Sequence, residues 1–269
     1  MRMNKQYYQF ILITLIILID VNGSDQEPIV PTCMICLQKL NGEYSVDVWG
    51  NTFHSKHEKE GVFCHSCSRI ISQGVTQGGY VYSDGRHLCS LCKITAVNND
   101  SSIQTSYQAV ITQFEEVGII NIVRNIPINL VSLQELNKKA GYMSHVKLKG
   151  FTIIDPILEE TTQPVNPCQI SILFGLPLIE FEAVLAHELL HVWIYENDLD
   201  LSSFISEGFC NLGADLIYNN DSTKFSQIHL KALAENKHPK YGEGYLFMKK
   251  TLEKSGWKNL LKNLASIEK

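Results

Sequence analysis

The pattern of apolar and polar residues predicts alternating helices and strands from about residue 97 onward. A helix is expected from Ile103 to about Asn125, because apolar residues recur there near helical spacing. Ser102 precedes it and is the expected cap. The polar tract 97–102 is a natural domain boundary, so the first 96 residues are expected to fold separately.

Further elements follow in the order of an α+β domain. Strands are predicted over 126–131, 147–154 and 169–174, and helices over 132–139 and 180–196. Ser132 and Glu135 form a capping box for the shorter helix, and Gly141 ends it. The polar, proline-containing tract 155–167 is expected to be a loop beside a cleft, and the chain is expected to be helical from Tyr245 to its end.

The first 23 residues have the pattern of a secretory signal peptide. Arg2 and Lys5 precede an apolar run over 10–19, and Val21 and Gly23 fit a cleavage site. The run is too short for a membrane-spanning helix, which needs about 20 apolar residues. The sequence therefore predicts a periplasmic or secreted protein with no stable membrane span, and a linker over 24–31 after the signal.

Composition narrows the classes of function. The chain has 269 residues, enough for one large domain or two modest ones, and a hydrophobic content of 45%, typical of globular proteins. Lys and Arg number 23 and Asp and Glu number 28, for a net charge of −5. This mild acidity gives no support to a nucleic-acid partner.

Six of the eight cysteines form three C-x2-C pairs in the first 96 residues, and two histidines have the same spacing. Each C-x2-C step is a turn that can present two thiolates to one tetrahedral ion. Eight side chains therefore make two candidate structural zinc sites: Cys33, Cys36, His54, His57, Cys64, Cys67, Cys89 and Cys92. The short, Gly-containing stretches between the pairs predict β-hairpins.

This region, residues 32–96, resembles a LIM domain, in which two zinc fingers are packed in tandem and serve to recognise a protein partner or substrate. LIM domains usually carry His-x2-Cys where this chain has His54-x2-His57, so His65 is kept as an alternative fourth ligand, although it is expected to face solvent. An exported protein could instead join the cysteines in disulfides. The paired spacing with interposed histidines favours metal.

The helix predicted over 180–196 contains His187-Glu188-Leu189-Leu190-His191, an HExxH motif. Residues four apart lie on one face of a helix, so the two histidines can point at a single zinc ion. Glu188 can reach a water molecule held by that ion and act as a general base. The strand predicted over 169–174 comes directly before this helix, and its edge could align an extended peptide as a further strand.

Glu207 is the predicted third ligand, because a catalytic zinc takes three protein ligands and keeps one open position. Fifteen residues with a turn separate it from His191, so a second helix can return against the first. Asn211 and Asp215 follow at intervals of one turn, and either could accept the ring N–H of a ligand histidine. Cys210 is the rival ligand and is expected to be buried instead.

Several residues remain without a single expected role. His229, His238, Tyr241 and Tyr245 are candidates to stabilise the oxyanion, and Tyr241 and His238 lead because a Gly-rich turn over 238–245 could bring them close. Cys168 is either a free thiol or a disulfide partner of Cys210.

The combined motifs narrow the resemblance to one family. They are Ile172-Leu173-Phe174-Gly175-Leu176-Pro177, the segment 185–193 around HELLH, Glu207-Gly208 and Tyr241-Gly242-x-Gly244, after a LIM-like module. This combination is similar to the DA-one family of LIM-domain metallopeptidases, known as ubiquitin-activated regulators of plant organ growth.

The resemblance implies a zincin-like peptidase domain over 97–269, of the gluzincin type, with one catalytic and two structural Zn²⁺ ions. By position it carries over His187, Glu188, His191 and Glu207, and it implies a protein or peptide substrate. Gluzincins usually have a carboxylate at the place of Asn211, so this residue is a departure. The plant substrates and ubiquitin activation are not carried over, because the chain shows no acidic ubiquitin-interacting helix.

Two other functions remain open. The chain could be a non-catalytic zinc-binding interaction protein in which the LIM-like module is the working part, although an intact Glu188 and Glu207 argue against a dead site. The same zinc-bound water could also hydrolyse a bond other than a peptide bond.

Overall fold

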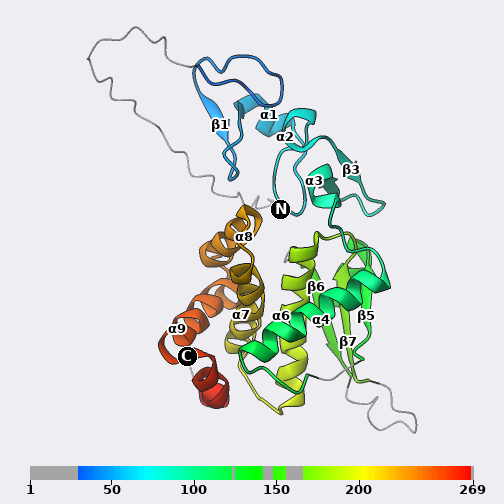
Figure 1. The fold of residues 1–269 in the computed structure, drawn as a ribbon, viewed down its shortest axis with the longest axis vertical. Helices are drawn as coiled ribbons and strands as arrows, with labels where there is room; N and C mark the ends of the chain where they lie inside the picture. The colour runs from blue at the N-terminus through cyan, green and yellow to red at the C-terminus, as the bar shows by residue number, and fades with distance from the viewer. Residues whose placement is uncertain (1–29, 123–124, 142–147, 156–165, 268–269) are drawn as a thin grey trace, which may run out of the picture.

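The structure, a computed structural model, describes residues 30–122, 125–141, 148–155 and 166–267 (Figure 1). The predicted signal peptide, most of the predicted linker and most of the polar tract 155–167 lie outside these residues. Within the described ranges, every helix is too short or too polar to cross a membrane. The fold is a mixed α+β arrangement with a Cys-rich N-terminal region that has the side chains to bind metal.

The Cys-rich module, residues 32–96, contains two antiparallel hairpins, as the sequence predicts, together with short helices that were not predicted. Its elements are β1 (Tyr44–Val46), β2 (Thr52–His54), α1 (Ser55–Glu60), α2 (Gln73–Thr76), β3 (Gly79–Val81), β4 (His87–Cys89) and α3 (Ser90–Lys93). Its two small apolar clusters contain the cysteines themselves. Because so little apolar surface is buried, metal binding would contribute much of the folding free energy.

The C-terminal domain begins with helix α4 (Asp100–Glu116), which is shifted from the predicted range. Asn99, not Ser102, is the N-cap: its side chain accepts the Ser102 amide, and Ser102 closes the capping box as the third helical residue. The helix ends before Gly118, whose φ of +87° does not continue a right-handed helix. The residue whose side chain accepts a hydrogen bond from the free amides of the first turn therefore decides where the helix begins.

Three strands form the sheet of this domain, in the order β5 (Ile128–Val131), β7 (Cys168–Leu173), β6 (Gly150–Ile154). Strand β5 runs parallel to β7, and β6 pairs antiparallel with β7 at the edge. Between β5 and β6, helix α5 (Leu133–Ala140) has the predicted capping box of Ser132 and Glu135. The central strand β7 is almost fully buried, although Gln169 and Ser171 interrupt its apolar residues.

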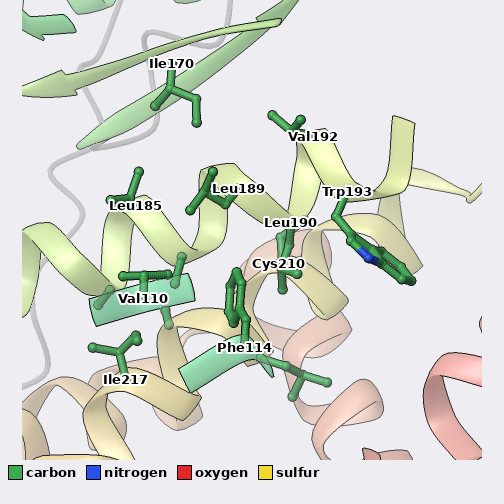
Figure 2. Packing of buried hydrophobic residues seen from close by; sticks show 14 of the residues in the cluster. Val110, Phe114, Ile170, Leu185, Leu189, Leu190, Val192, Trp193, Cys210 and Ile217 are labelled. Carbon is green, nitrogen blue, oxygen red and sulfur yellow. The ribbon is translucent and has the colours of Figure 1, made fainter. Parts of the chain in front are cut away.

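Helices α6 (Leu178–Glu196) and α7 (Ser203–Asn220) cross at close range and form the centre of the domain. At the crossing, a side chain on Gly213 would meet the Ala186 carbonyl at 3.0 Å, so the glycine favours this close approach. Figure 2 shows apolar side chains of α4, α6, α7 and β7 meeting in one core. The chain then continues through α8 (Lys224–Glu235), the π-helical turn η3 (Pro239–Glu243), α9 (Gly244–Asn263, kinked at Gly256) and η4 (Leu264–Ser266).

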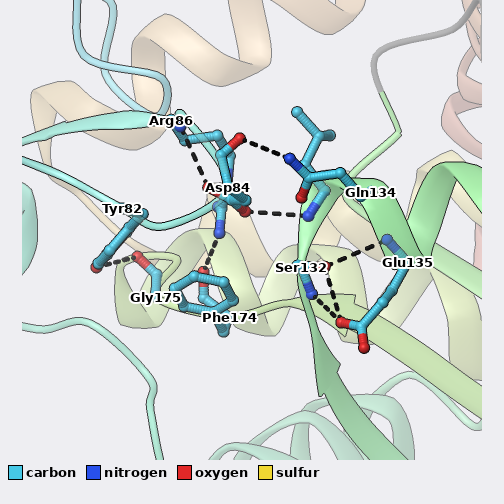
Figure 3. Close-up of polar contacts among 9 residues, drawn as sticks. Tyr82, Asp84, Arg86, Ser132, Gln134, Glu135, Phe174 and Gly175 are labelled. Atoms are coloured by element: carbon cyan, nitrogen blue, oxygen red, sulfur yellow. Dashed lines mark hydrogen bonds and ion pairs between the residues drawn. The ribbon is translucent and has the colours of Figure 1, made fainter.

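The Cys-rich module is joined to the C-terminal domain by a buried polar junction (Figure 3). Asp84 accepts hydrogen bonds from Arg86 Nε at 2.7 Å and from the Leu133 amide at 3.0 Å. Arg86 also donates to the Phe174 carbonyl at 2.8 Å, at the end of β7. Main-chain bonds between Val97 and 175–176 continue the contact, so the module is fixed where α6 is about to begin.

Candidate active site

The structure brings His187, His191 and Glu207 together at the crossing of α6 and α7. The two histidines, four residues apart on α6, place their Nε2 atoms 3.2 Å from each other. Glu207 Oε2, from the second turn of α7, lies 3.3 Å from His187 Nε2 and 3.6 Å from His191 Nε2. These three residues form a group that could hold a metal ion.

The spacing of these three atoms fits zinc. Donor atoms placed about 2.0–2.1 Å from a tetrahedral zinc ion stand about 3.4 Å apart, close to the three distances above. Glu207 Oε2 is buried and faces the Nε2 atoms of both histidines, as expected of three atoms that share one metal position. Burial raises the pKa of Glu207, but hydrogen bonds and charge from the two histidines lower it well below its usual range, so the ligand is ionised.

A glycine contact beside Glu207 helps to set the place of this residue. Gly208, the next residue, packs against Gly244, and a side chain on Gly208 would meet the Gly244 carbonyl oxygen at 2.3 Å. This contact holds the start of α9 and the turn η3 against α7 beside the site. The pair Glu207-Gly208 and the glycines around Tyr241 are therefore parts of one packing arrangement.

Asn211 connects the ligand histidine to the turn η3. Its Oδ1 lies 3.0 Å from His187 Nδ1, and its Nδ2 donates to the Tyr241 carbonyl at 2.8 Å. With Oδ1 accepting the Nδ1–H, the Nε2 lone pair of His187 faces the metal position. Asn211 is only 7% exposed, so both contacts are protected from water.

Asp215 does not share this role, and its predicted contact with a ligand histidine is wrong. Its carboxylate instead accepts the Tyr245 hydroxyl at 2.6 Å and pairs with Lys249 Nζ. The residue lies one turn farther along α7, where that helix faces α9. It therefore joins two helices and does not orient a ligand.

Glu188 lies on the sheet side of the site and is 5% exposed. Its Oε2 accepts a hydrogen bond from Thr152 Oγ1 at 2.7 Å. A side chain on Gly150 would meet Glu188 Oε1 at 2.6 Å, so the carboxylate occupies the space beside this glycine. Thr152 and Gly150 were not identified from the sequence, because no local motif marks the strand that faces the metal ligands.

A cavity of about 180 Å³ opens at these residues. Its lining is the three ligand candidates, Glu188 and the residues Leu148, Gly150, Phe151, Thr152, Ile154 and Tyr241. Strand β6 therefore forms one wall, and it is the edge strand of the sheet. The expectation that strand 169–174 would offer its edge to a substrate is wrong, because β7 pairs on both sides.

The four oxyanion candidates occupy different places. Tyr241 lines the cavity, and its hydroxyl lies against Glu207. Burial, followed by the charges of Glu207 and Glu188, raises the pKa of Tyr241, so its hydroxyl remains a neutral donor.

The other three do not line the cavity. His238 is exposed and caps η3 through its Nδ1, so its expected place at the oxyanion is wrong. Tyr245 is bonded to Asp215, and His229 packs between Tyr218 and Phe225. Cys210 lies in the apolar core as expected, and no disulfide joins it to Cys168.

The Cys-rich module holds two further groups of possible ligands. Cys64, Cys67, Cys89 and Cys92 form one group, with Cys67 and Cys89 sulfurs 3.7 Å apart. Sulfurs about 2.3 Å from a tetrahedral zinc ion stand about 3.8 Å apart, whereas a disulfide bond is only about 2.05 Å long. All eight cysteines are thiols, so the geometry favours metal over disulfides.

The second group consists of Cys33, Cys36, His54 and His57. His57 Nε2 is buried without a hydrogen-bond partner, as expected of a ligand atom. His65 belongs to neither group, and it faces the C-terminal domain instead of solvent, beside the charges of Lys149 and Glu180. Among the described residues, His57 is therefore the better fourth ligand.

Comparison with known proteins finds similarity over the region of the site. Residues 142–217, which include all four predicted catalytic-site residues, match the family model DA1-like: Protein DA1. The curated Protein DA1-related 2 of Arabidopsis thaliana is 28% identical over 193 residues, covering 61% of this chain and 36% of the relative. The LIM domain-containing protein HDR3 of Oryza sativa subsp. japonica is 26% identical over 221 residues, covering 68% of this chain and 43% of the relative.

Protein DA1 of Arabidopsis thaliana is 26% identical over 196 residues, covering 62% of this chain and 36% of the relative. The chain spans less than half the length of these relatives. No solved structure gives a significant match. The segment that carries the candidate active site is thus similar to the DA1-like family.

Proposed function

We propose that this chain is a zinc-dependent metallopeptidase with a zincin-like C-terminal domain. The observation that carries the proposal is the triangle of His187, His191 and Glu207 beside Glu188, on the wall formed by an edge strand. The two histidines and Glu207 would hold the metal, and Glu188 is the base. Similarity to the DA1-like family over this segment supports the assignment.

Zinc bound there would lower the pKa of its water to about 7 and polarise a carbonyl group. Glu188 takes the proton of the attacking water as the oxygen bonds to the scissile carbonyl carbon, and then gives that proton to the leaving nitrogen as the C–N bond breaks. The Tyr241 hydroxyl donates a hydrogen bond to the oxyanion that develops. Asn211 holds His187 in the tautomer that offers Nε2 to the metal.

The substrate would bind as an extended peptide along β6. One edge of this strand pairs with β7 and the other is open in the described sheet. A peptide added there gains main-chain hydrogen bonds, and pockets beside the strand select side chains. Leu148, Phe151 and Ile154 make these pockets apolar.

The Cys-rich module would contribute recognition of a substrate or partner protein. Its first finger exposes large apolar side chains, including Leu37 at 74% and Val46 at 50%. This surface also favours the second candidate function, a binding protein without catalysis. The two functions differ in whether Glu188 is needed.

Replacement of Glu188 by Gln tests the proposal directly. The variant should keep its zinc and lose cleavage of a denatured protein library, read by mass spectrometry of the new N-termini. Glu182→Gln is the matched control, since Glu182 is buried on the same helix but lies outside the cavity. Cleavage by Glu188→Gln at the wild-type rate would refute a peptidase that uses this base, and an inactive, zinc-loaded wild-type chain would favour the binding function.

Metal content provides a second test. The three groups of ligands lead to about three zinc ions per chain. One ion together with oxidised cysteines would refute the module's zinc sites, and two ions with none at His187 would refute the enzyme.

Export remains part of the proposal and rests on the pattern of the first 23 residues. A mature N-terminus near Ser24 would support it, and retention of Met1 would contradict it.

A further inference from the structure

Thr152 makes two polar contacts with the residue that serves as base. Its Oγ1 donates to Glu188 Oε2 at 2.7 Å, and the main-chain carbonyl of Glu188 also lies within reach, at 3.2 Å. Thr152 lies on β6 and lines the cavity. The hydroxyl thus contacts Glu188 from the strand wall of the site. Among the described residues, Thr152 is the donor to Oε2.

The surroundings of Glu188 leave its carboxylate few other ways to be held. Only 5% of the residue is exposed, so water cannot replace a lost hydrogen bond easily. On the other side, Gly150 leaves the space that Oε1 occupies. The hydroxyl donor and the glycine therefore fix the two oxygens of one carboxylate.

We propose that Thr152 is a positioning residue that aims the Glu188 carboxylate at the attacking water. This role rests on the proposed peptidase function. The strand holds the hydroxyl in place, because Thr152 pairs with Ile170 of the buried central strand. Since β6 is also the strand that would receive the substrate, the base and the peptide are placed by the same element.

The chemistry of a hydroxyl suits this role during the reaction. A threonine hydroxyl donates one proton and can also accept one. While Glu188 is ionised, the hydroxyl donates to Oε2. Once the other carboxylate oxygen has taken the proton of the water, Oε2 is still an acceptor, so the hydroxyl continues to donate to it. The contact is kept in both states.

Thr152→Val tests the proposal, because it removes the hydroxyl and keeps the branched shape. Thr152→Ser keeps the hydroxyl and should restore the contact. Thr112→Val is the matched control, since Thr112 is exposed on α4 and its hydroxyl donates to the Gln108 carbonyl of the same helix. The assays are kcat and KM on one cleaved peptide, zinc content, thermal stability and the Glu188 position in crystals of the zinc-loaded variants.

We expect kcat of Thr152→Val to fall about 10- to 100-fold, because a misplaced base costs that much. KM should stay within about twofold, because the substrate contacts are unchanged. Zinc content and melting temperature should match those of Thr112→Val, the Glu188 carboxyl should be displaced, and Thr152→Ser should approach the wild type.

Three outcomes would overturn the role. The first is a Thr152→Val variant with wild-type kcat in a wild-type chain that cleaves, which refutes the positioning role alone. The second is a loss of kcat that accompanies lost zinc or a lowered melting temperature, or that Thr152→Ser does not restore. The third is a wild-type chain as inactive as Glu188→Gln, which refutes the proposed function and this role together.

Discussion

Asn211→Asp offers a sharp test of how the site is assembled. Asn211 accepts from His187 Nδ1 with its oxygen and donates to the Tyr241 carbonyl with its nitrogen. An aspartate would preserve the first contact, since a carboxylate is a good acceptor for the ring N–H of a metal-binding histidine. It would lose the second, because a carboxylate oxygen cannot donate to a carbonyl. The substitution therefore separates the effect of Asn211 on the metal-binding histidine from its effect on Tyr241.

The cost follows from the burial of this contact. Asn211 is only 7% exposed, so water cannot easily replace its hydrogen bond to the Tyr241 carbonyl. Loss of a buried donor of this kind costs about 1–3 kcal/mol of free energy. If that free energy is lost from the placement of Tyr241 in the transition state, kcat falls about 5- to 150-fold, since 1.36 kcal/mol is a factor of ten. Zinc affinity should change little.

The assay combines kcat on a cleaved peptide with zinc affinity from competition with a chelator. Asn211→Ala is the comparison, because it removes both contacts and should weaken zinc binding about 10- to 100-fold. Tyr241→Phe completes a double-mutant cycle with Asn211→Asp. If Asn211 acts through the Tyr241 hydroxyl, the two losses should be far from additive.

Either of two results would refute this reasoning. One is wild-type kcat in Asn211→Asp, which would mean that the amide donor does not place Tyr241. The other is a loss of zinc as large as in Asn211→Ala, which would mean that the carboxylate cannot serve His187. Full additivity with Tyr241→Phe would show that Asn211 acts by another route.

Three further predictions concern the strand wall, the junction and pH. Gly150→Ala should abolish cleavage but keep zinc, because its new methyl would meet Glu188 Oε1 at 2.6 Å; unchanged kcat would contradict this. Arg86→Met should lower the free energy of unfolding in urea by about 3–5 kcal/mol, because buried Asp84 loses its partner. Adding Asp84→Asn in a double variant should recover part of that loss. A decrease below about 1 kcal/mol would refute a buried ion pair. In metal-free protein, Glu207 has a pKa below its usual 4.5, so the ionised carboxylate stabilises the fold above pH 4.5 and this stabilisation is lost as the pH falls further. The difference in melting temperature between wild type and Glu207→Gln should therefore shrink as the pH falls below 4.5. A difference that stays constant would contradict this reasoning.

Local signals in the sequence predicted the parts of this fold that depend on neighbouring residues. The capping box at Ser132 and the HExxH motif are read within five residues, and the C-x2-C turns within four. The helix over 180–196 differs from α6 by two residues at its start. Each of these features is decided by hydrogen bonds or side-chain spacing over one or two turns.

The remaining features depend on pairing between distant segments. A strand's place in a sheet is not encoded in its own residues, so β7 was assigned the role that the edge strand β6 has. For the same reason Thr152 could not be connected with Glu188. The choice between Asn211 and Asp215 depends on which helix faces each turn of α7, and the sequence alone does not show this.

If the four-cysteine group holds zinc, the junction between the Cys-rich module and the C-terminal domain gives that metal a part in assembling the chain. The hairpin of β3 and β4 carries Asp84 and Arg86 and ends at Cys89, so the four-cysteine group shapes the surface that binds Phe174. Gly175 next to it has a φ of +71°, and the Tyr82 ring covers its Cα, so no other residue fits there. In a zinc-starved cell, the newly made chain would leave this surface uncovered at the start of α6. The supply of a metal to one end of the protein would then affect how the other end packs.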